Sequence, residues 1–191
     1  MIRAIIFDCF GVLVVSRRAA LFEDFPTLTT EIHDLELRSD YGYISRVEFN
    51  QAVGELIQLD PDEVDKRYWS GSTRNESALA FIRELRSGGA YKTGLLTNVG
   101  KDWLEDFLPA VERTELFDAE VISSEVGMLK PQPEIYELVA EQLGCEPSEC
   151  VMIDDLPPNV EGAIRVGMQG IVFVSTEQLQ RDLGELLAKV R

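Results

Sequence analysis

Short, continuous apolar segments are the feature that most limits what this sequence can fold into. Five of them, each four to six residues long, end in polar or small residues; they occupy positions 2–7, 92–96, 119–122, 150–153 and 170–174. Because apolar residues follow one another instead of alternating with polar ones, both faces of each strand are expected to be buried. Such strands are typical of a parallel sheet covered by helices on both sides.

The segments between these strands have the periodicity of amphipathic helices. Apolar residues recur at helical spacing before the second, fourth and fifth strands and after the fifth: Leu79, Ile82, Leu85; Ile135, Leu138, Val139, Leu143; Ala163, Ile164, Val166; Leu179, Leu183, Leu186, Leu187. Strands that alternate with such helices predict an α/β fold, a doubly wound parallel sheet.

A long insertion separates the first predicted strand from the second. It contains helix-start signals: Ser45 and Glu48 form a capping box, and Asp60 precedes Pro61 as an N-cap precedes the first helical residue. We therefore expect a small helical cap at residues 16–75. Residues 1–15 and 76–191 are expected to form the α/β core.

Charge and cysteine content exclude several classes of function. The chain has 18 Lys+Arg against 34 Asp+Glu, a net charge of −16, and no basic run, so neither nucleic acid nor an anionic membrane is an expected partner. Its apolar runs are far shorter than the roughly 20 residues of a membrane span, and Asp8 interrupts the apolar start, unlike a signal peptide. Three cysteines without a C-x-x-C pair, and only one histidine, predict free thiols and a cytoplasmic protein. His33, in an acidic segment, is expected to be solvated or structural.

Polar residues follow the predicted strands at their carboxyl ends, where open parallel sheets bind ligands. These residues are Asp8, Thr97, Asn98, Ser123, Ser124, Asp154 and Asp155. Three carboxylates at one sheet edge repel one another unless a cation offsets them, and oxygen ligands without histidine suit Mg²⁺. Lys130, just beyond the third strand, supplies a positive charge near this cluster.

Four motifs at these strand ends resemble those of the haloacid dehalogenase superfamily of hydrolases, which are mostly phosphatases with an aspartyl nucleophile and Mg²⁺. In chain order they are FDCFGV at 7–12, LLTN at 95–98, Lys130 within EVGMLKPQPEIYELV, and VMIDD at 151–155, followed by Asn159. The resemblance covers residues 1–15 and about 76–175. Each motif alone is weak, whereas the ordered set, each at a strand end, is specific.

The resemblance implies how a phosphorylated small molecule would be handled. Asp8 would be the nucleophile that forms an aspartyl-phosphate. Thr97 would hydrogen-bond a phosphate oxygen with Asn98 close by, and Lys130 would neutralise Asp8 and the phosphoryl group. The backbone N–H groups of Cys9 and Phe10 would also contact the phosphoryl group, while the Cys9 thiol is expected to point into the core.

The resemblance also implies the ligands of Mg²⁺. Asp8, the backbone carbonyl of Phe10 and the carboxylate of Asp155 would bind the ion. Asp154 would hold a metal-bound water or Lys130.

Phe10 is the one departure from the family pattern. Phosphatases of this family usually carry a second Asp there, which protonates the leaving oxygen and later activates water; losing such a group typically costs ~10²–10⁴ in rate. Three hypotheses follow: a Mg²⁺-dependent phosphatase that favours good leaving groups, a 2-haloacid dehalogenase-type hydrolase with Arg38 or Arg46 binding a carboxylate, or a non-catalytic domain that binds a phosphorylated ligand or a partner.

Several properties stay open at this stage. The sequence does not specify the substrate, and it is compatible with a homodimer without indicating one. Four aromatic residues of the insertion, Tyr41, Tyr43, Tyr68 and Trp69, are compatible with lining the cap cleft or with packing between helices.

Overall fold

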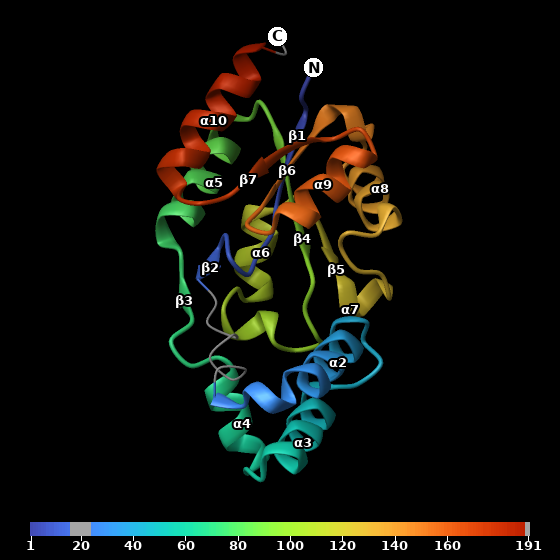
Figure 1. Cartoon of the computed structure of the whole chain (residues 1–191). Helices are drawn as coiled ribbons and strands as arrows, with labels where there is room; N and C mark the ends of the chain where they lie inside the picture. Colours follow the sequence, from blue (N-terminus) through green and yellow to red (C-terminus); the bar gives the residue numbers. More distant parts are fainter. Residues whose placement is uncertain (16–23, 190–191) are drawn as a thin grey trace.

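The computed structural model describes residues 1–15 and 24–189. Within them, five strands form one parallel sheet in the order β5-β4-β1-β6-β7 (Figure 1): β1 (Ala4–Phe7), β4 (Lys92–Thr97), β5 (Ala119–Ile122), β6 (Cys150–Asp154) and β7 (Gln169–Val172). The predicted parallel α/β sheet is confirmed. Because β1 lies in the centre, with β4 and β6 as neighbours, its carboxyl end is enclosed on both sides.

Strand ends differ slightly from the predicted ones. The sequence predicts strands at 2–7 and 170–174, whereas β1 begins at Ala4 and β7 ends at Val172. Pairing decides these limits: Ala4 lies opposite both Lys92 and Cys150, and Val172 lies opposite Asp154. Apolar character alone does not mark where a strand loses its ladder partner.

Helices cover both faces of the sheet. One apolar core joins Ile5 and Phe7 of β1 to α5 (Glu76–Gly88) and α10 (Thr176–Lys189). The other joins Ala4 and Ile6 to α8 (Pro133–Gln142) and α9 (Pro157–Arg165), on the opposite side of the sheet (Figure 1). Alternate residues of β1 therefore enter different cores, which explains why this strand is continuously apolar.

Shorter elements complete this part of the chain. They are η2 (Leu104–Asp106), α6 (Ala110–Leu116), α7 (Ser123–Val126) and η3 (Pro147–Glu149). No helix within the described ranges is long and apolar enough to cross a membrane.

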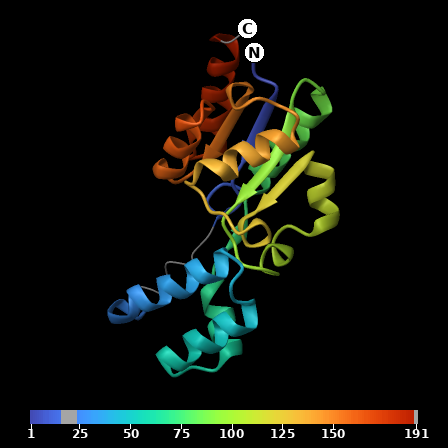
Figure 2. The same cartoon turned by 90° about the vertical axis from the view of Figure 1, so that its right-hand side faces the viewer.

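Between β1 and α5 the chain leaves the sheet and forms helices at one end of the molecule (Figures 1 and 2). Two short strands, β2 (Val14–Val15) and β3 (Thr73–Arg74), pair antiparallel. Beyond them lie η1 (Pro26–Leu28), α2 (Thr29–Asp40), α3 (Arg46–Ile57) and α4 (Pro61–Tyr68). We call α2, α3 and α4 the inserted helices. The division at residues 15 and 76 stays a prediction.

The helix-start signals read from the sequence form as expected. The Ser45 hydroxyl accepts a hydrogen bond from the amide of Glu48, and the Glu48 carboxylate accepts one from the amide of Ser45. The capping box is therefore complete at the start of α3. Asp60 caps α4 by accepting the amide of Asp62, with Pro61 as the first helical residue.

Polar contacts hold the inserted helices against the core. Arg46 binds Asp65 through two hydrogen bonds of 2.7 and 2.6 Å and also pairs with Asp106 at 2.7 Å. The Ser123 hydroxyl donates to the carbonyl oxygen of Asp40 at 2.7 Å. The end of α2 is therefore held against α7, and the start of α3 is held against η2, which contains Asp106.

Candidate active site

The carboxyl ends of three adjacent strands bring the central site residues together. Asp8 follows β1, Thr97 ends β4 and Asp154 ends β6, so Asp8 is flanked by the other two. The Asp8 amide donates to the carbonyl of Ile153 at 2.9 Å, which extends the ladder one residue past β1. All three side chains are buried.

Lys130 reaches this cluster from the loop before α8. Its Nζ lies 2.7 Å from Oδ1 of Asp8 and 2.6 Å from Oδ2 of Asp154, and its side chain is only 1% exposed. One ammonium group thus bridges two buried carboxylates, an arrangement that tolerates burial only because the charges are paired.

Two asparagines fix the orientation of these charged groups. The Lys130 amide donates to Oδ1 of Asn98 at 2.9 Å, and Nδ2 of Asn98 donates to the Lys130 carbonyl at 3.0 Å. Nδ2 of Asn159 lies 3.1 Å from both oxygens of Asp154, which also accepts the amide of Leu156. Asn98, predicted beside a phosphate oxygen, therefore also positions Lys130.

Asp8, Asp154 and Asp155 form an oxygen cluster suited to a metal ion. One carboxylate oxygen from each lies within 4.8 Å of the others. Gly11, with φ of +107°, lies directly against Asp155, where a Cβ would collide with the carboxylate. The donor set is oxygen only and carries three negative charges against one from Lys130, so it fits Mg²⁺.

Burial and neighbouring charges shift the pKa values of Asp8 and Lys130 in opposite directions. Burial raises the pKa of Asp8 to about 7, against the lowering effect of Lys130, and the neighbouring Asp154 adds to the rise. Burial alone would lower the pKa of Lys130, but Asp8 and Asp154 raise it above its ordinary value. Lys130 therefore stays protonated, while Asp8 is easily protonated until a cation joins the cluster.

Thr97 has a buried hydroxyl without a hydrogen-bond partner among the described residues. Its side chain is fully buried at the end of β4, next to the strand that leads to Asp8. Buried polar groups are nearly always satisfied, so an unsatisfied one at a ligand-binding edge indicates a group that the ligand completes.

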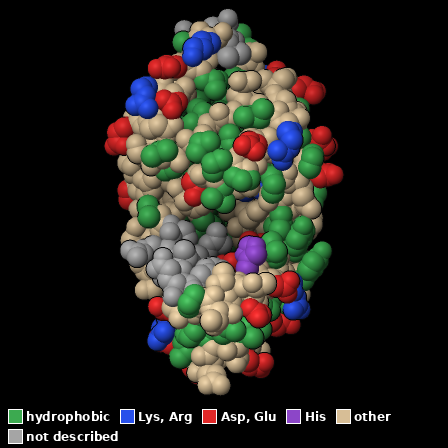
Figure 3. All heavy atoms as spheres, viewed as in Figure 1, with side chains coloured by type: hydrophobic (Ala, Val, Ile, Leu, Met, Phe, Trp, Pro, Cys, Tyr) green, Lys and Arg blue, Asp and Glu red, His purple; other side chains and the backbone are tan. Residues whose placement is uncertain are grey.

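A cavity of about 400 Å³ opens above these residues. Its walls come from the sheet edge and from α2: Asp8, Phe10, Asn98, Leu129, Lys130, Leu156, Asn159, His33, Glu36, Leu37 and Asp40. The hollow beside the purple histidine in Figure 3 lies between the inserted helices and the core. The site is thus a pocket lined by Asp8 and Lys130 from the sheet edge and by residues of α2.

The sequence model of the family of haloacid dehalogenase-like hydrolases matches residues 2–167 of the chain. The chain belongs to this family. The resemblance inferred from the four motifs is confirmed, and the family is one of hydrolases.

Two curated relatives match parts of the chain. Flavin mononucleotide hydrolase 1 of Arabidopsis thaliana is 47% identical over 60 residues, which are 31% of this chain and 24% of that protein. Phosphatase MT3486 of Mycobacterium tuberculosis is 30% identical over 142 residues, 72% of this chain and 62% of that protein. The chain thus spans less than two thirds of the length of either relative.

Solved structures agree on the fold. The haloacid dehalogenase family enzyme bt-2542 of Bacteroides thetaiotaomicron, in complex with magnesium and inorganic phosphate, superposes with a TM-score of 0.74. It is 24% identical, and the match covers 90% of this chain and 93% of that chain. At this identity the comparison establishes the shared fold alone.

Phe10 has a packing role in this member of the family. Its ring centroid lies 4.9 Å from that of Trp69 and 5.8 Å from that of Phe107, and the side chain is almost fully buried. It joins the inserted helices to the core. Cys9 is buried in the apolar core, as predicted from its position.

His33 is the residue that the sequence interpretation undervalued. Its side chain is 62% exposed, as expected of a solvated histidine, but it lines the cavity that contains Asp8. A helical signal was present: residues 33, 36, 37 and 40 follow the spacing of one helix face, and all four line the cavity.

The other residues considered for the insertion lie elsewhere. None of Tyr41, Tyr43, Tyr68 and Trp69 is among the cavity-lining residues. Tyr68 and Trp69 are buried; Tyr68 stacks on Trp103, and Trp69 contacts Trp103 edge-on. Tyr41 and Tyr43 stack on each other at 5.3 Å. Arg46, suggested as a carboxylate ligand for a haloacid, is instead bound by Asp65 and Asp106.

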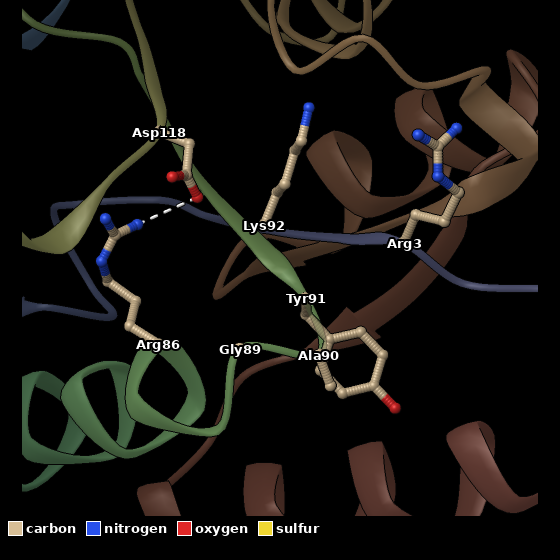
Figure 4. Close-up of a pocket in the computed structure, with 7 residues that line it drawn as sticks. All are labelled: Arg3, Arg86, Gly89, Ala90, Tyr91, Lys92 and Asp118. Carbon is tan, nitrogen blue, oxygen red and sulfur yellow. Dashed lines mark ion pairs between the residues drawn. The ribbon is translucent and has the colours of Figure 1, made fainter.

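A second cavity, of about 420 Å³, lies at the opposite end of the strands (Figure 4). It is lined by three basic residues, one before β1, one at the start of β4 and one in the last turn of α5, and each has a partner within the protein. Arg86 pairs with Asp118 at 2.9 Å, Lys92 donates to the carbonyl of Leu143 at 2.6 Å, and Arg3 pairs with Glu149 at 2.8 Å. The basic side chains of this cavity are therefore already engaged within the protein.

Proposed function

We propose that this chain is a Mg²⁺-dependent phosphatase of a small phosphorylated metabolite, acting through an aspartyl-phosphate on Asp8. The observation that carries the proposal is the cluster of Asp8, Asp154 and Asp155, in which Lys130 bridges Asp8 and Asp154, and in which Asp8 and Lys130 line a cavity. The names of the two curated relatives, a flavin mononucleotide hydrolase and a phosphatase, support a phosphorylated substrate.

Asp8, Asp155 and the backbone carbonyl of Phe10 are the proposed ligands of Mg²⁺. When bound, the ion supplies positive charge against the oxygens of the phosphoryl group. Asp154 binds Lys130 and, of the two roles predicted for it, would therefore hold that ammonium group in place.

The protein's own residues account for the transfer. The Asp8 carboxylate attacks phosphorus, the bond to the leaving oxygen breaks, and an aspartyl-phosphate forms. Lys130 holds Oδ1 of Asp8, and the Thr97 hydroxyl donates to a phosphoryl oxygen, as do the amides of Cys9 and Phe10. Water then hydrolyses the aspartyl-phosphate, releasing phosphate and restoring the carboxylate.

The leaving oxygen needs a proton in the first step and the attacking water must lose one in the second. The Phe10 side chain cannot exchange protons, so it supplies neither of these proton transfers. Substrates with good leaving groups, which need little protonation, are expected to react fastest.

The inserted helices act as a cap over this cavity in the proposed division, with residues 16–75 as the cap and residues 1–15 and 76–191 as the core. Cys9, Cys145 and Cys150 are free thiols, which supports a reducing compartment such as the cytoplasm.

The test compares Asp8→Asn with Asp34→Asn, a substitution at an exposed position of α2 that does not line the cavity. With p-nitrophenyl phosphate and Mg²⁺, we expect Asp8→Asn to lose roughly 10³-fold or more in kcat/KM and Asp34→Asn to match the unmodified protein. Equal activity of the two variants, with or without Mg²⁺, would refute the assignment of Asp8 as the nucleophile. Halide release from a 2-haloacid without Mg²⁺ would instead support the dehalogenase hypothesis, and phosphate binding without turnover would support the non-catalytic one.

A further inference from the structure

The reaction proposed above lacks a group that moves the proton of the leaving oxygen. Lys130 is not suited to this task, because its Nζ is held by Asp8 and Asp154 at 2.7 and 2.6 Å. Any replacement for the missing acid must therefore come from another wall of the cavity. The wall formed by α2 contains the single histidine of the chain.

His33 lies on the face of α2 that closes the cavity. Together with Glu36, Leu37 and Asp40 it faces the pocket that Asp8 and Lys130 line from the sheet edge. A leaving group between these two walls would have Asp8 on one side and the imidazole on the other. Transfer of a phosphoryl group requires the attacking and leaving oxygens on opposite sides of phosphorus, so an acid on a different wall from Asp8 suits the reaction.

Contacts within the inserted helices orient the imidazole. Nδ1 of His33 lies 3.4 Å from Oε2 of Glu36, and Oε1 of Glu36 accepts the hydroxyl proton of Tyr68 at 2.6 Å. Tyr68 is buried among the aromatic rings of Phe49, Trp69 and Trp103, so it provides a rigid support for Glu36. A carboxylate on one ring nitrogen selects the tautomer and leaves the other nitrogen, Nε2, for proton transfer.

We propose that His33 is the general acid and base of this site, in place of the acid that Phe10 lacks, with Glu36 as its positioning residue. The inference rests on the proposed phosphatase function. As Asp8 attacks phosphorus, the imidazolium of His33 gives its proton to the leaving oxygen, and the alcohol departs. The neutral imidazole then takes a proton from the water that hydrolyses the aspartyl-phosphate, which restores the imidazolium and the Asp8 carboxylate.

The test uses two substrates of nearly the same shape that differ in how much they need the proton. p-Nitrophenyl phosphate has a good leaving group, whereas 4-nitrobenzyl phosphate releases an alcohol that must be protonated. The variants are His33→Ala, Glu36→Gln and, as a matched control, Asp34→Ala on an exposed position of α2 outside the cavity. Alanine at these positions favours the helix, so folding is preserved.

We expect His33→Ala to lower kcat/KM for 4-nitrobenzyl phosphate by about 10²-fold or more while changing that for p-nitrophenyl phosphate by less than about 3-fold. Added imidazole is expected to restore part of the lost activity. Glu36→Gln is expected to shift the same ratio in the same direction by a smaller factor, and Asp34→Ala to leave both values unchanged.

The outcomes separate this inference from the function on which it rests. If Asp8→Asn abolishes activity but His33→Ala lowers kcat/KM equally for both substrates, or for neither, the phosphatase function stands and the proposed role of His33 is wrong. If Asp8→Asn keeps full activity, the phosphatase function fails and the role of His33 fails with it. Inorganic phosphate binding, measured by calorimetry, is expected to be the same in His33→Ala and the unmodified protein, and a large loss would make His33 a binding group instead.

Discussion

Thr97 and Thr93 are two threonines of one strand that the structure places in opposite situations. Both are fully buried in β4. The Thr93 hydroxyl donates to the carbonyl of Leu116 at 2.6 Å and accepts from Arg86 at 2.9 Å. The Thr97 hydroxyl has no hydrogen-bond partner among the described residues. Replacement of each by valine, which has the same shape, therefore measures two different quantities.

For Thr97→Val we expect a gain of about 1 kcal/mol in the free energy of unfolding, because a desolvated hydroxyl without a partner costs about 1–3 kcal/mol and valine favours strands. For Thr93→Val we expect a loss of about 1–3 kcal/mol, because the Leu116 carbonyl is left unsatisfied in the core. Activity is expected to change the other way. Thr97→Val removes a donor to the phosphoryl group and lowers kcat by about 10²-fold, whereas Thr93→Val keeps the site intact.

Urea unfolding of the two variants in buffer without Mg²⁺ or phosphate, at equal m-values, gives the stability changes. Hydrolysis of p-nitrophenyl phosphate gives the activity changes. A loss of stability in Thr97→Val together with unchanged kcat would show that the hydroxyl is satisfied within the protein and has no ligand to bind. The reasoning from Thr97 to a phosphoryl contact would then be refuted.

Two further predictions concern the metal cluster. Gly11→Ala is expected to weaken Mg²⁺ binding, measured by calorimetry, at least tenfold, because the added Cβ collides with Asp155 at a φ of +107°; Gly88→Ala, where the Cβ meets open space, is the control and is expected to bind Mg²⁺ normally. Burial raises the pKa of Asp8 to about 7, so between about pH 4 and pH 7 the folded protein without metal holds a proton that the unfolded chain has released. Its free energy of unfolding is therefore expected to fall as the pH rises through that window; urea unfolding tests this, and an identical pH dependence in Asp8→Asn would contradict it.

Much of the core was predictable because its signals are local. An apolar strand buried on both faces has few alternatives, and five such strands separated by amphipathic helices specify a parallel sheet. The capping residues Ser45 and Asp60 also act within their own helices, so their positions predicted two helix starts correctly. Strand limits were less accurate because they depend on the neighbouring strand: β7 ends at Val172, opposite Asp154.

The candidate site was predictable where strand ends carry it. Asp8, Thr97 and Asp154 each end or follow a strand, and the order of the strands alone brings them together. The contacts of Asn98 with the backbone of Lys130 were not predictable in this way, because they join a strand end to a loop 32 residues further along. Nothing local in the sequence indicates that both polar groups of the Asn98 amide bind the backbone of Lys130.

Phe10 and His33 show why the remaining part of the site depends on how the inserted helices meet the sheet. In the sequence, Phe10 is an aromatic residue where an acid is usual, and His33 is a histidine in an acidic helix. In the structure, the Phe10 ring packs on Trp69 and Phe107, whereas His33 lines the cavity beside Asp8. An aspartate in place of Phe10 would bury a charge among aromatic rings. The residue at this position can therefore either pack between the inserted helices and the core or donate a proton, but it cannot do both. A member of the family that uses this position for packing must therefore obtain its proton donor from another wall of the cavity, and α2 is the element that supplies one.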